Sequence, residues 1–272
     1  MLRLSAPRLT ALKLAAWLTM FVGVATAQPS IFSGGVINGA SFEKGQAVAP
    51  GGLVAIFGTG LASETIPGDT IPLSATIGGT SATFNGIPAG LYFVSDGQVN
   101  AQLPWDVLPS GVSSGTANMV VTGPSGSSEA FTVQVIPAAP GIFSFPPGAG
   151  YAIAINADGS LAAPAGVIAG ITTHSAKVGD TLIVLATGLG AVSPSDANGA
   201  ASLDALRNTL SVPVVLIGGK QAGVPFSGLS PQFPGINQVN VVVPQVGPGN
   251  SIPLQFQMGS ITSTDQVVVA IQ

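Results

Sequence analysis

The chain of 272 residues is 46% hydrophobic and only 7% charged, has no cysteine, and carries a formal net charge of −4 at pH 7. Beyond residue 27 only four Lys and Arg residues remain, and they are scattered singly. Nucleic-acid binding needs grouped basic side chains that neutralise phosphates, so this function is excluded. One histidine and no cysteine also argue against a zinc site, and the composition indicates no cofactor.

The first 27 residues are predicted to be a signal peptide. Three basic residues precede the apolar stretch 14–24, which is too short to span a bilayer comfortably. The small residues Ala25 and Ala27 form a signal-peptidase pattern that places cleavage before Gln28. Four basic and all eleven acidic residues remain, giving a mature charge of −7 and no expected membrane span. We expect export to the periplasm, the outer surface or the medium; a retained membrane anchor is the alternative.

Short apolar runs, each bounded by Gly, Pro, Asn or Ser, recur along the rest of the chain. None is long enough for a helix, and such runs between turn residues are typical of an all-β fold. Only residues 204–210 are predicted to form a brief helical turn. The expected strands lie at residues 53–57, 91–94, 99–103, 119–121, 131–136, 182–185, 212–217, 239–243, 252–256 and 267–271.

An internal repeat organises these runs into two copies of one domain. Residues 51–61, GGLVAIFGTGL, match residues 179–189, GDTLIVLATGL, at an offset of 128. In both segments Thr-Gly-Leu places a glycine at a strand end, where positive φ allows the chain to turn sharply. The first domain is predicted to cover residues 28–137 and the second residues 138–272.

Two further motifs follow in the same order in both copies. Ile-Gly-Gly at 77–79 is predicted to be a tight hairpin turn, and we match it with Ile-Gly-Gly at 217–219, at an offset of 140. Gln-Val-Asn at 98–100 and 238–240 is predicted to lie in a central strand that a following proline ends. The larger offset gives the second copy 12 additional residues, which we place around 193–210. Together these patterns predict two tandem immunoglobulin-like β-sandwich domains.

The connector between the copies, residues 137–143, contains two prolines three positions apart and the apolar pair Ile142-Phe143. Prolines stiffen a linker and apolar residues can pack on a neighbouring domain. We therefore expect limited freedom between the two domains.

Six segments, taken in order, resemble the uncharacterised C-terminal domain family that is expanded in Acidobacteria of the Solibacter type. The individual copies are similar to IPT/TIG domains, which are immunoglobulin-like folds of cell-surface receptors and extracellular proteins. The resemblance covers Val36 to Gln272 and implies a secreted or envelope β-sandwich pair, but it brings no catalytic or binding residues. The segments are PGGLVAIFGTGLA, LYFVSDGQVNAQLPW, PAAPGIFS, AIAINADGSL, GDTLIVLATGLG and GINQVNVVVP.

Two residues are candidates for catalytic chemistry. Ser113 lies in GVSSG, residues 111–115, which formally matches the G-x-S-x-G nucleophile elbow of serine hydrolases. That elbow requires a strand-to-helix turn, whereas the flanks predict a polar hairpin loop, so a Gly/Ser-rich turn is favoured. His174, the only histidine, lies in the polar connector 172–175. We predict an exposed loop histidine with no local carboxylate to orient it.

Residues 156–160, Asn-Ala-Asp-Gly-Ser, superficially match part of a calcium loop. The full twelve-residue loop with its terminal glutamate is absent, and Asp-Gly between apolar strands is a strong hairpin signal. A turn is therefore favoured over an ion site here, and likewise at Asp96-Gly97.

Trp105, Tyr92 and Phe93 are the candidate ligand-binding residues. Large aromatic side chains can form an apolar platform for a sugar ring or a partner surface. Burial in the sandwich core is the favoured alternative, because such cores are usually anchored by aromatic residues.

The sequence thus predicts a non-catalytic, exported structural or interaction module whose partner, a protein or a polysaccharide, it does not identify. A secreted carbohydrate-binding or carbohydrate-acting protein is the alternative, and a serine hydrolase is the second alternative. No catalytic, cofactor-binding or metal-binding residues are assigned. A binding site, if present, is expected in the unequal parts of the repeat: the additional residues around 193–210 or the aromatic strip near Trp105.

Overall fold

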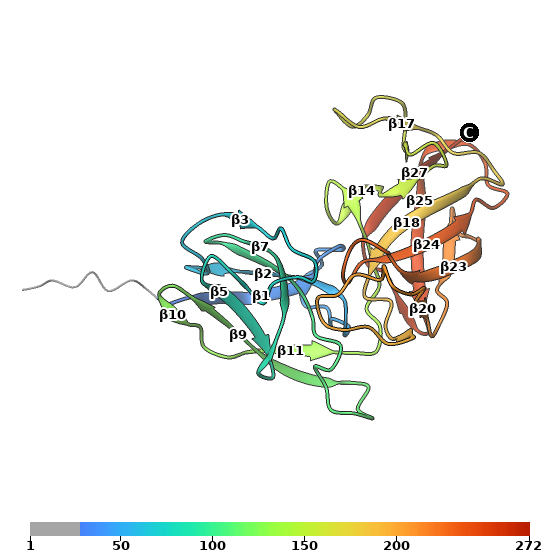
Figure 1. Ribbon diagram of the computed structural model, residues 1–272. Coiled ribbons are helices and arrows are strands. Elements are labelled where there is room, and N and C mark those ends of the chain that lie inside the picture. The colour runs from blue at the N-terminus through green and yellow to red at the C-terminus, as the bar shows by residue number, and fades with distance from the viewer. Residues whose placement is uncertain (1–27) are drawn as a thin grey trace, which may run out of the picture.

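The computed structural model of the protein describes residues 28–272, so the predicted signal peptide, residues 1–27, lies outside the described residues. Every regular element between Gln28 and Gln272 is a β-strand, and the predicted all-β class is confirmed. The strands form two groups that lie end to end (Figure 1), which we call the N-terminal sandwich, residues 30–135, and the C-terminal sandwich, residues 141–271. Within residues 28–272 no helix is long and apolar enough to cross a membrane.

Eleven strands build the N-terminal sandwich: β1 (Ser30–Asn38), β2 (Leu53–Thr59), β3 (Ile66–Pro67), β4 (Thr76–Ile77), β5 (Thr80–Phe84), β6 (Ile87–Pro88), β7 (Gly90–Val94), β8 (Gln98–Gln102), β9 (Gly115–Gly123), β10 (Gly126–Ser127) and β11 (Phe131–Val135). They form two sheets. One has the order β1-β2-β8-β7-β3 and the other the order β10-β9-β5-β4, with β11 paired to β9 and β6 to β5.

The strand order of the N-terminal sandwich is that of an immunoglobulin constant-type domain. The neighbours β1-β2-β8-β7 correspond to strands A-B-E-D, and β5-β9-β11 correspond to C-F-G, all of them antiparallel pairs. A parallel bridge between Val48, in the segment that follows β1, and Val135 joins this segment to strand G. The immunoglobulin-like topology therefore follows from the strand pairing itself.

The core lies between the two sheets, and the alternation of residues along each strand places it there. In β9, Ala117, Met119 and Val121 are buried while Thr116 and Asn118 are exposed, as the period of two in a strand requires. Burying one large apolar side chain contributes roughly 1.5–3 kcal/mol. Because the chain has no cysteine, this burial and the backbone ladders hold the sandwich together.

Sixteen strands build the C-terminal sandwich: β12 (Gly141–Ile142), β13 (Ser144–Phe145), β14 (Ala149–Ala152), β15 (Ala154–Ile155), β16 (Leu161–Ala162), β17 (Thr173–His174), β18 (Thr181–Thr187), β19 (Val192–Ser193), β20 (Asn208–Thr209), β21 (Val214–Ile217), β22 (Lys220–Gln221), β23 (Gly223–Leu229), β24 (Asn237–Val242), β25 (Gly249–Met258), β26 (Ile261–Thr262) and β27 (Gln266–Ile271). They also form two sheets. The orders are β17-β16-β15-β18-β24-β23-β20-β19, with β12 paired to β18, and β13-β14-β27-β25-β21-β22, with β26 paired to β25.

The C-terminal sandwich repeats the immunoglobulin-like order. Here β15-β18-β24-β23 correspond to A-B-E-D and β21-β25-β27 to C-F-G. The parallel bridge recurs between Ala176 and Ile271. Each sandwich has its own cluster of buried apolar residues. Independent folding of residues 28–137 and 138–272 as two domains stays a prediction.

One part of the predicted alignment between the copies is wrong. The hairpin β21–β22, with its turn at Gly218-Gly219, corresponds to β5–β6, with its turn at Asn85-Gly86, because β21 pairs with β25 as β5 pairs with β9. All four turn residues have positive φ. The turn at Gly78-Gly79 also forms as predicted, but it belongs to the β4–β5 hairpin, which precedes this position. Two similar Ile-Gly-Gly motifs were thus matched although they occupy different hairpins.

The corrected alignment divides the 12 additional residues between two places. The offset between the copies grows from 128 to 133 between strands B and C, and from 133 to 140 between strands D and E. Five of the extra residues therefore lie in residues 189–213, which we call the BC segment. The other seven lie in residues 230–236, which we call the DE segment.

Other local predictions can be compared directly with the backbone. The glycines of the two Thr-Gly-Leu motifs, Gly60 and Gly188, have φ of 68° and 76°, as predicted. The helical turn predicted at 204–210 is wrong: Asn208 and Thr209 are extended, because they pair with β23 and β19.

Candidate functional site at the contact between the sandwiches

The contact between the two sandwiches begins at Thr187, the last residue of β18. The Thr187 hydroxyl accepts a hydrogen bond from the N–H of Leu53 in β2 at 2.7 Å and donates one to the Gly235 carbonyl of the DE segment at 2.7 Å. Thr187 is fully buried, whereas Thr59, its counterpart in the N-terminal sandwich, is exposed. The same threonine therefore joins the sandwiches in one copy and faces solvent in the other.

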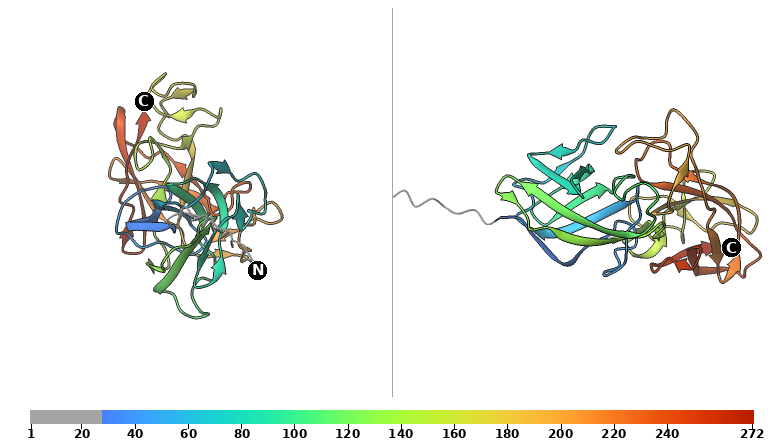
Figure 2. Two further views of the ribbon diagram at one scale, coloured as in Figure 1. Left: turned by 90° about the vertical axis from the view of Figure 1, so that its left-hand side faces the viewer. Right: turned by 90° about the horizontal axis from the view of Figure 1, so that it is seen from below.

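The BC segment belongs to the orange part of the chain, which lies beside the N-terminal sandwich in Figure 2 (right). Hydrogen bonds of Gly199 attach it to that sandwich. The Gly199 N–H donates to Gln102 Oε1 at 2.6 Å, and its carbonyl accepts from the N–H of Leu73 at 2.8 Å. Gln102 is 1% exposed and donates its amide N–H to the Gly51 carbonyl at 3.3 Å. Gly199 has a φ of 75°, and a Cβ there would lie 3.1 Å from the Leu73 carbonyl oxygen, so only glycine fits without strain.

Asn198, beside Gly199, extends the contact to the predicted aromatic strip. Its side-chain oxygen accepts a hydrogen bond from the backbone N–H of Trp105 at 2.8 Å. Its side-chain nitrogen donates to Asp106 Oδ1 at 2.9 Å. The two unequal parts of the repeat in which a site was expected, the additional residues and the strip near Trp105, therefore bind to each other.

The predicted ligand-binding residues lie at or near this contact. The Trp105 ring packs over Gly51 and leaves no room for a Cβ there, and its indole N–H is buried without a hydrogen-bond acceptor. The Tyr92 hydroxyl donates to the Pro234 carbonyl of the DE segment at 2.8 Å, and burial raises its pKa. Phe93 is half-buried in β7 opposite Pro67. Their role in ligand binding stays a prediction, but Tyr92 already has an intramolecular partner.

A groove of about 370 Å³ runs along the contact, and both sandwiches line it. Trp105 and Val112 contribute from the N-terminal sandwich, and Leu210 and Met258 from the C-terminal sandwich. Leu210 is 68% exposed and Val112 47% exposed. Small-molecule and partner sites are commonly mostly apolar clefts at such domain contacts. Trp105 therefore faces both the contact and an accessible groove.

Ser113 lies in the same groove but not in the setting of a nucleophile elbow. It is exposed in the loop that leads into β9, so the residues that follow it form a strand. A nucleophile elbow instead passes from a strand into a helix, which presents the serine beside an oxyanion hole. Residues 111–114 form a loop as predicted, but Gly115 already belongs to β9. The predicted hairpin is wrong, because this segment leads from β8 in one sheet to β9 in the other.

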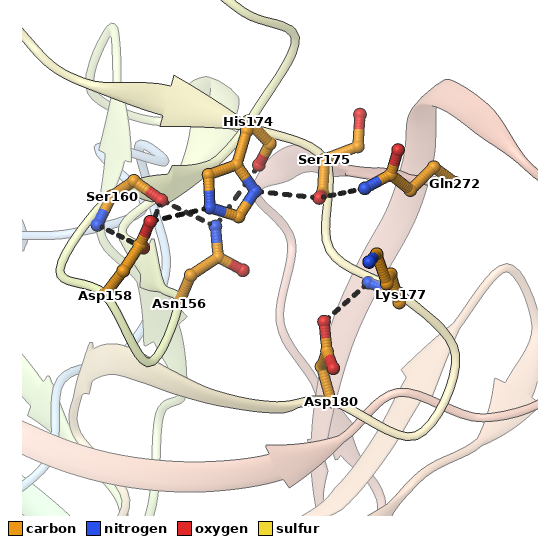
Figure 3. A network of polar contacts seen from close by, with 8 residues as sticks. All are labelled: Asn156, Asp158, Ser160, His174, Ser175, Lys177, Asp180 and Gln272. Carbon is orange, nitrogen blue, oxygen red and sulfur yellow. Dashed lines mark hydrogen bonds and ion pairs between the residues drawn. The ribbon is translucent and has the colours of Figure 1, made fainter.

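The prediction of a loop histidine that no carboxylate orients is wrong, because His174 lies in β17, paired with β16. Asp158 Oδ2 lies 3.0 Å from His174 Nε2, and the Ser175 carbonyl lies 2.9 Å from Nδ1 (Figure 3). Because both ring nitrogens face acceptors, only the protonated imidazole donates on both sides. These contacts, first that to Ser175, raise the pKa of His174. Hydrogen bonds from Ser160, aided by His174, lower the pKa of Asp158 to about 2.

This polar cluster holds a turn together and does not have the geometry of a catalytic triad. The Ser160 hydroxyl donates to Asp158 Oδ1 at 2.7 Å, not to His174, and Ser160 is only 2% exposed. A nucleophilic serine is instead paired with the histidine and open to substrate. Gly159, with a φ of 85°, closes the predicted turn between β15 and β16. Asp96-Gly97 likewise joins β7 to β8 as predicted.

Asp265, which is 4% exposed, is the one acidic residue in the buried class among residues 28–272. It accepts a hydrogen bond from the Ile142 N–H, whereas its Oδ1 has no partner. Burial is the main reason why its pKa is raised. Across residues 28–272, no three His, Cys, Asp or Glu side chains lie close enough to hold a metal ion.

The residues that carry the contact were missed because each looks ordinary in the sequence. Thr187, Asn198 and Gly199 lie in turn-like stretches, and hydrogen bonds to a partner more than 90 residues away leave no periodic pattern. One available signal was the unequal spacing of the two copies, since both the BC and DE segments end up in the contact. A second was Gln102, an amide on a strand face where the other copy has Val242.

Comparisons with known proteins identify no family. No protein-family model matches the chain, and no curated protein matches it. The resemblance to the Solibacter-type family therefore stays a prediction.

Solved structures with similar folds are all distant. SGBP-B of the Bacteroides ovatus mixed-linkage glucan utilization locus, solved in complex with a mixed-linkage heptasaccharide, is 15% identical to this chain with a TM-score of 0.32. The alignment covers 83% of this chain and 44% of SGBP-B. Domains 5–6 of the S-layer protein SbsC are 10% identical with a TM-score of 0.30, and the alignment covers 90% of this chain and 98% of the SbsC chain. The D00-D0 domain of intimin is 11% identical with a TM-score of 0.22, and the alignment covers 84% of this chain and 96% of the intimin chain. This chain spans less than half the length of the first three matches. The fold assignment rests on strand order.

Proposed function

We propose that this protein is a non-catalytic exported module in which two immunoglobulin-like sandwiches are locked into one rigid body that serves as a structural or interaction element outside the cytoplasm. The observation that carries the proposal is the contact itself: both stretches gained by the C-terminal copy are bound to the N-terminal copy. A flexible tether would need none of these bonds.

The energetics of the contact support rigidity. Thr187 and Gln102 are buried polar side chains, and each satisfies hydrogen-bonding groups of both sandwiches. Separating the sandwiches would expose these groups or leave them unpaired, at roughly 1–3 kcal/mol for each unsatisfied buried group. Domains of one chain move relative to each other by default, so the rigidity proposed here depends on these buried hydrogen bonds. The signal-peptide pattern supports an exported location.

NMR relaxation measurements test directly whether the two sandwiches tumble as one rigid body. Backbone ¹⁵N relaxation of the mature chain is expected to give one rotational correlation time for both sandwiches. A double variant, Thr187→Val with Asn198→Ala, removes side-chain links between them and is expected to separate the two values. Two clearly different correlation times in the unaltered chain would overturn the proposal.

The absence of catalysis is tested separately. The purified chain is expected to turn over none of a panel of ester, glycoside and peptide substrates. Hydrolysis that disappears in Ser113→Ala or His174→Ala, with the fold retained, would establish an enzyme instead.

A polysaccharide partner is the second candidate function, and the groove beside Trp105 favours it. The groove is mostly apolar, both sandwiches line it, and an indole ring forms part of its wall. Trp105 is the only tryptophan of the mature chain, so its fluorescence reports on the groove alone. A bound polysaccharide is expected to shift the emission maximum. Unchanged emission together with no retardation in polysaccharide-containing gels would exclude it.

A further inference from the structure

A second pocket is lined by residues of β1, of β2 and of the segment that follows β1. One of these residues, Phe42, lies next to the C-terminal sandwich, since a Cβ on Gly148 would come within 3.3 Å of the Phe42 Cβ. The volume of the pocket is about 310 Å³, at the lower end of the roughly 300–1,000 Å³ range of small-molecule sites. Three of its eight lining residues are phenylalanines: Phe32, Phe42 and Phe57. Lys44 is the single charged side chain in its lining.

The pocket exists because β1 leaves its partner strand for four residues. The pairing of β1 with β2 is regular at Ile31 and again from Val36, and a bulge separates the two. Gly35, within the bulge, packs so closely that a Cβ would lie 2.6 Å from the Phe57 carbonyl oxygen. Bulges re-aim side chains and open sheet edges, and are treated as built features. Here the bulge turns Phe32 outward, where it is 51% exposed.

Phe42, on the opposite wall, has a strained backbone. Its φ is 55°, and among residues 28–272 only Asn85 shares a positive φ without being glycine. A bulky residue in this region is strained, and such strain persists only where the surrounding structure holds the residue in place; it is most frequent at binding and active sites. The Phe42 and Phe57 rings lie 6.2 Å apart between centroids at 57°. The strained residue therefore completes a tilted aromatic pair that faces the pocket.

The charge of the pocket is opposite to that of the protein. Lys44 is the only Lys or Arg between Gln28 and Pro137, in a mature chain that carries eleven acids. Within the described residues no carboxylate lies in ion-pair distance of its ammonium group. An exposed aromatic pocket with one unpaired cation at its edge complements a ligand with an apolar body and a negative head.

We propose that this pocket binds a small amphipathic organic anion, with its apolar body between Phe32, Phe42 and Phe57 and its anionic group at Lys44. The inference deepens the proposed function, because it gives the rigid module a ligand class. The C-terminal sandwich lacks the site: the hairpin β13–β14 replaces the bulge, and Leu185 stands in place of Phe57. The binding property therefore belongs to one copy.

Titration of the mature chain with octanoate, followed by ¹H–¹⁵N chemical shifts, tests the proposal. Saturable shifts are expected at Gly34, Gly35 and Lys44, and none at the turn of the hairpin β21–β22, which does not line the pocket. Phe32→Ala and Lys44→Gln are each expected to weaken binding about fivefold or more, a loss of ~1 kcal/mol. Phe145→Ala and Lys177→Gln are matched controls expected to leave affinity within about twofold, because Phe145 is also 51% exposed and both residues lie outside the pocket.

Three results would overturn the proposal. If octanamide, the neutral counterpart, binds as tightly as octanoate, then Lys44 does not bind an anionic group and the proposal is wrong. Absence of saturable shifts at millimolar octanoate in a chain with native circular dichroism would remove the ligand class. Binding only to vesicles of phosphatidylglycerol, and not to free octanoate, would identify a membrane surface instead. The ¹⁵N relaxation experiment tests the rigid module without any ligand. Its result is therefore independent of octanoate binding, and either proposal can be wrong while the other holds.

Discussion

The two sandwiches share one strand order but use their duplicated positions differently. Thr59 of the N-terminal copy is exposed, and Thr187 of the C-terminal copy is buried between the sandwiches. Gln102 is matched by Val242, which has no polar group to offer. The comparison teaches that the two sandwiches share the strand order, and that residues outside the common frame supply hydrogen bonds between them.

Gly199→Ala is expected to have the largest effect, because it breaks the attachment of the BC segment. The new Cβ adds strain at positive φ and contacts the Leu73 carbonyl, which together cost about 2–4 kcal/mol. Gly159→Ala is the control: its φ of 85° is similar, but a Cβ there meets nothing within 4 Å. Urea denaturation should show the Gly199 variant losing at least about 1 kcal/mol more free energy of unfolding than the control. Equal losses would mean that the contact adds nothing.

Gln102→Val places the residue of the C-terminal copy into the N-terminal copy. The Gly199 N–H and the Gly51 carbonyl then lose their side-chain partner. We expect a loss of about 1–3 kcal/mol in the free energy of unfolding. The reciprocal change, Val242→Gln, lies at a half-buried position of the other sandwich and is expected to change stability by less than about 0.5 kcal/mol. Similar values for both variants would argue against the contact.

Thr187→Val against Thr59→Val compares one position in both copies. The buried Thr187 variant leaves the Leu53 N–H and the Gly235 carbonyl unpaired, for a loss of about 1–2 kcal/mol. Thr59 is exposed, and its variant should fall within about 0.5 kcal/mol of the parent. Chemical denaturation of both variants measures the difference between their free energies of unfolding. No difference would mean that the Thr187 hydroxyl does not stabilise the contact.

The smallest effect is expected at His174, which only the C-terminal copy has. The raised pKa of His174 means that its contribution to stability is complete below its ordinary pKa and is lost as pH rises through the folded value. Asp158, with its pKa lowered to about 2, stays ionised through this range. His174→Gln should therefore lower the melting temperature slightly at pH 5.5 and not at pH 9. A difference that persists at pH 9 would point to packing instead, since both side chains are substantially exposed.

The sequence was sufficient for the scaffold because scaffold residues act locally. A glycine that allows positive φ, such as Gly60, can be recognised from the few residues around it, and so can an Asp-Gly turn such as Asp158-Gly159. The Gln-Val-Asn strands were placed correctly at the centres of their sheets for the same reason, since the proline that follows each one marks its end.

The sequence failed where partners are distant in the chain. His174 and Asp158 are 16 residues apart and meet only because β15, β16 and β17 bring their ends together. Ile-Gly-Gly at 77–79 and 217–219 could be told apart only by the strands with which each hairpin pairs. The aromatic pocket was missed because it depends on a bulge and a strained Phe42, neither of which has a residue pattern.

The parallel bridges beside strand G give the molecule a mechanical property. Val48 exchanges two backbone hydrogen bonds with strand G, through Gln134 and Ile136, and Ala176 does the same through Ala270 and Gln272. When a parallel pair is pulled from the N-terminal end of one strand and the C-terminal end of the other, its bonds are loaded in shear and must break together. Tension along this chain would therefore meet two such clamps in series, one in each sandwich.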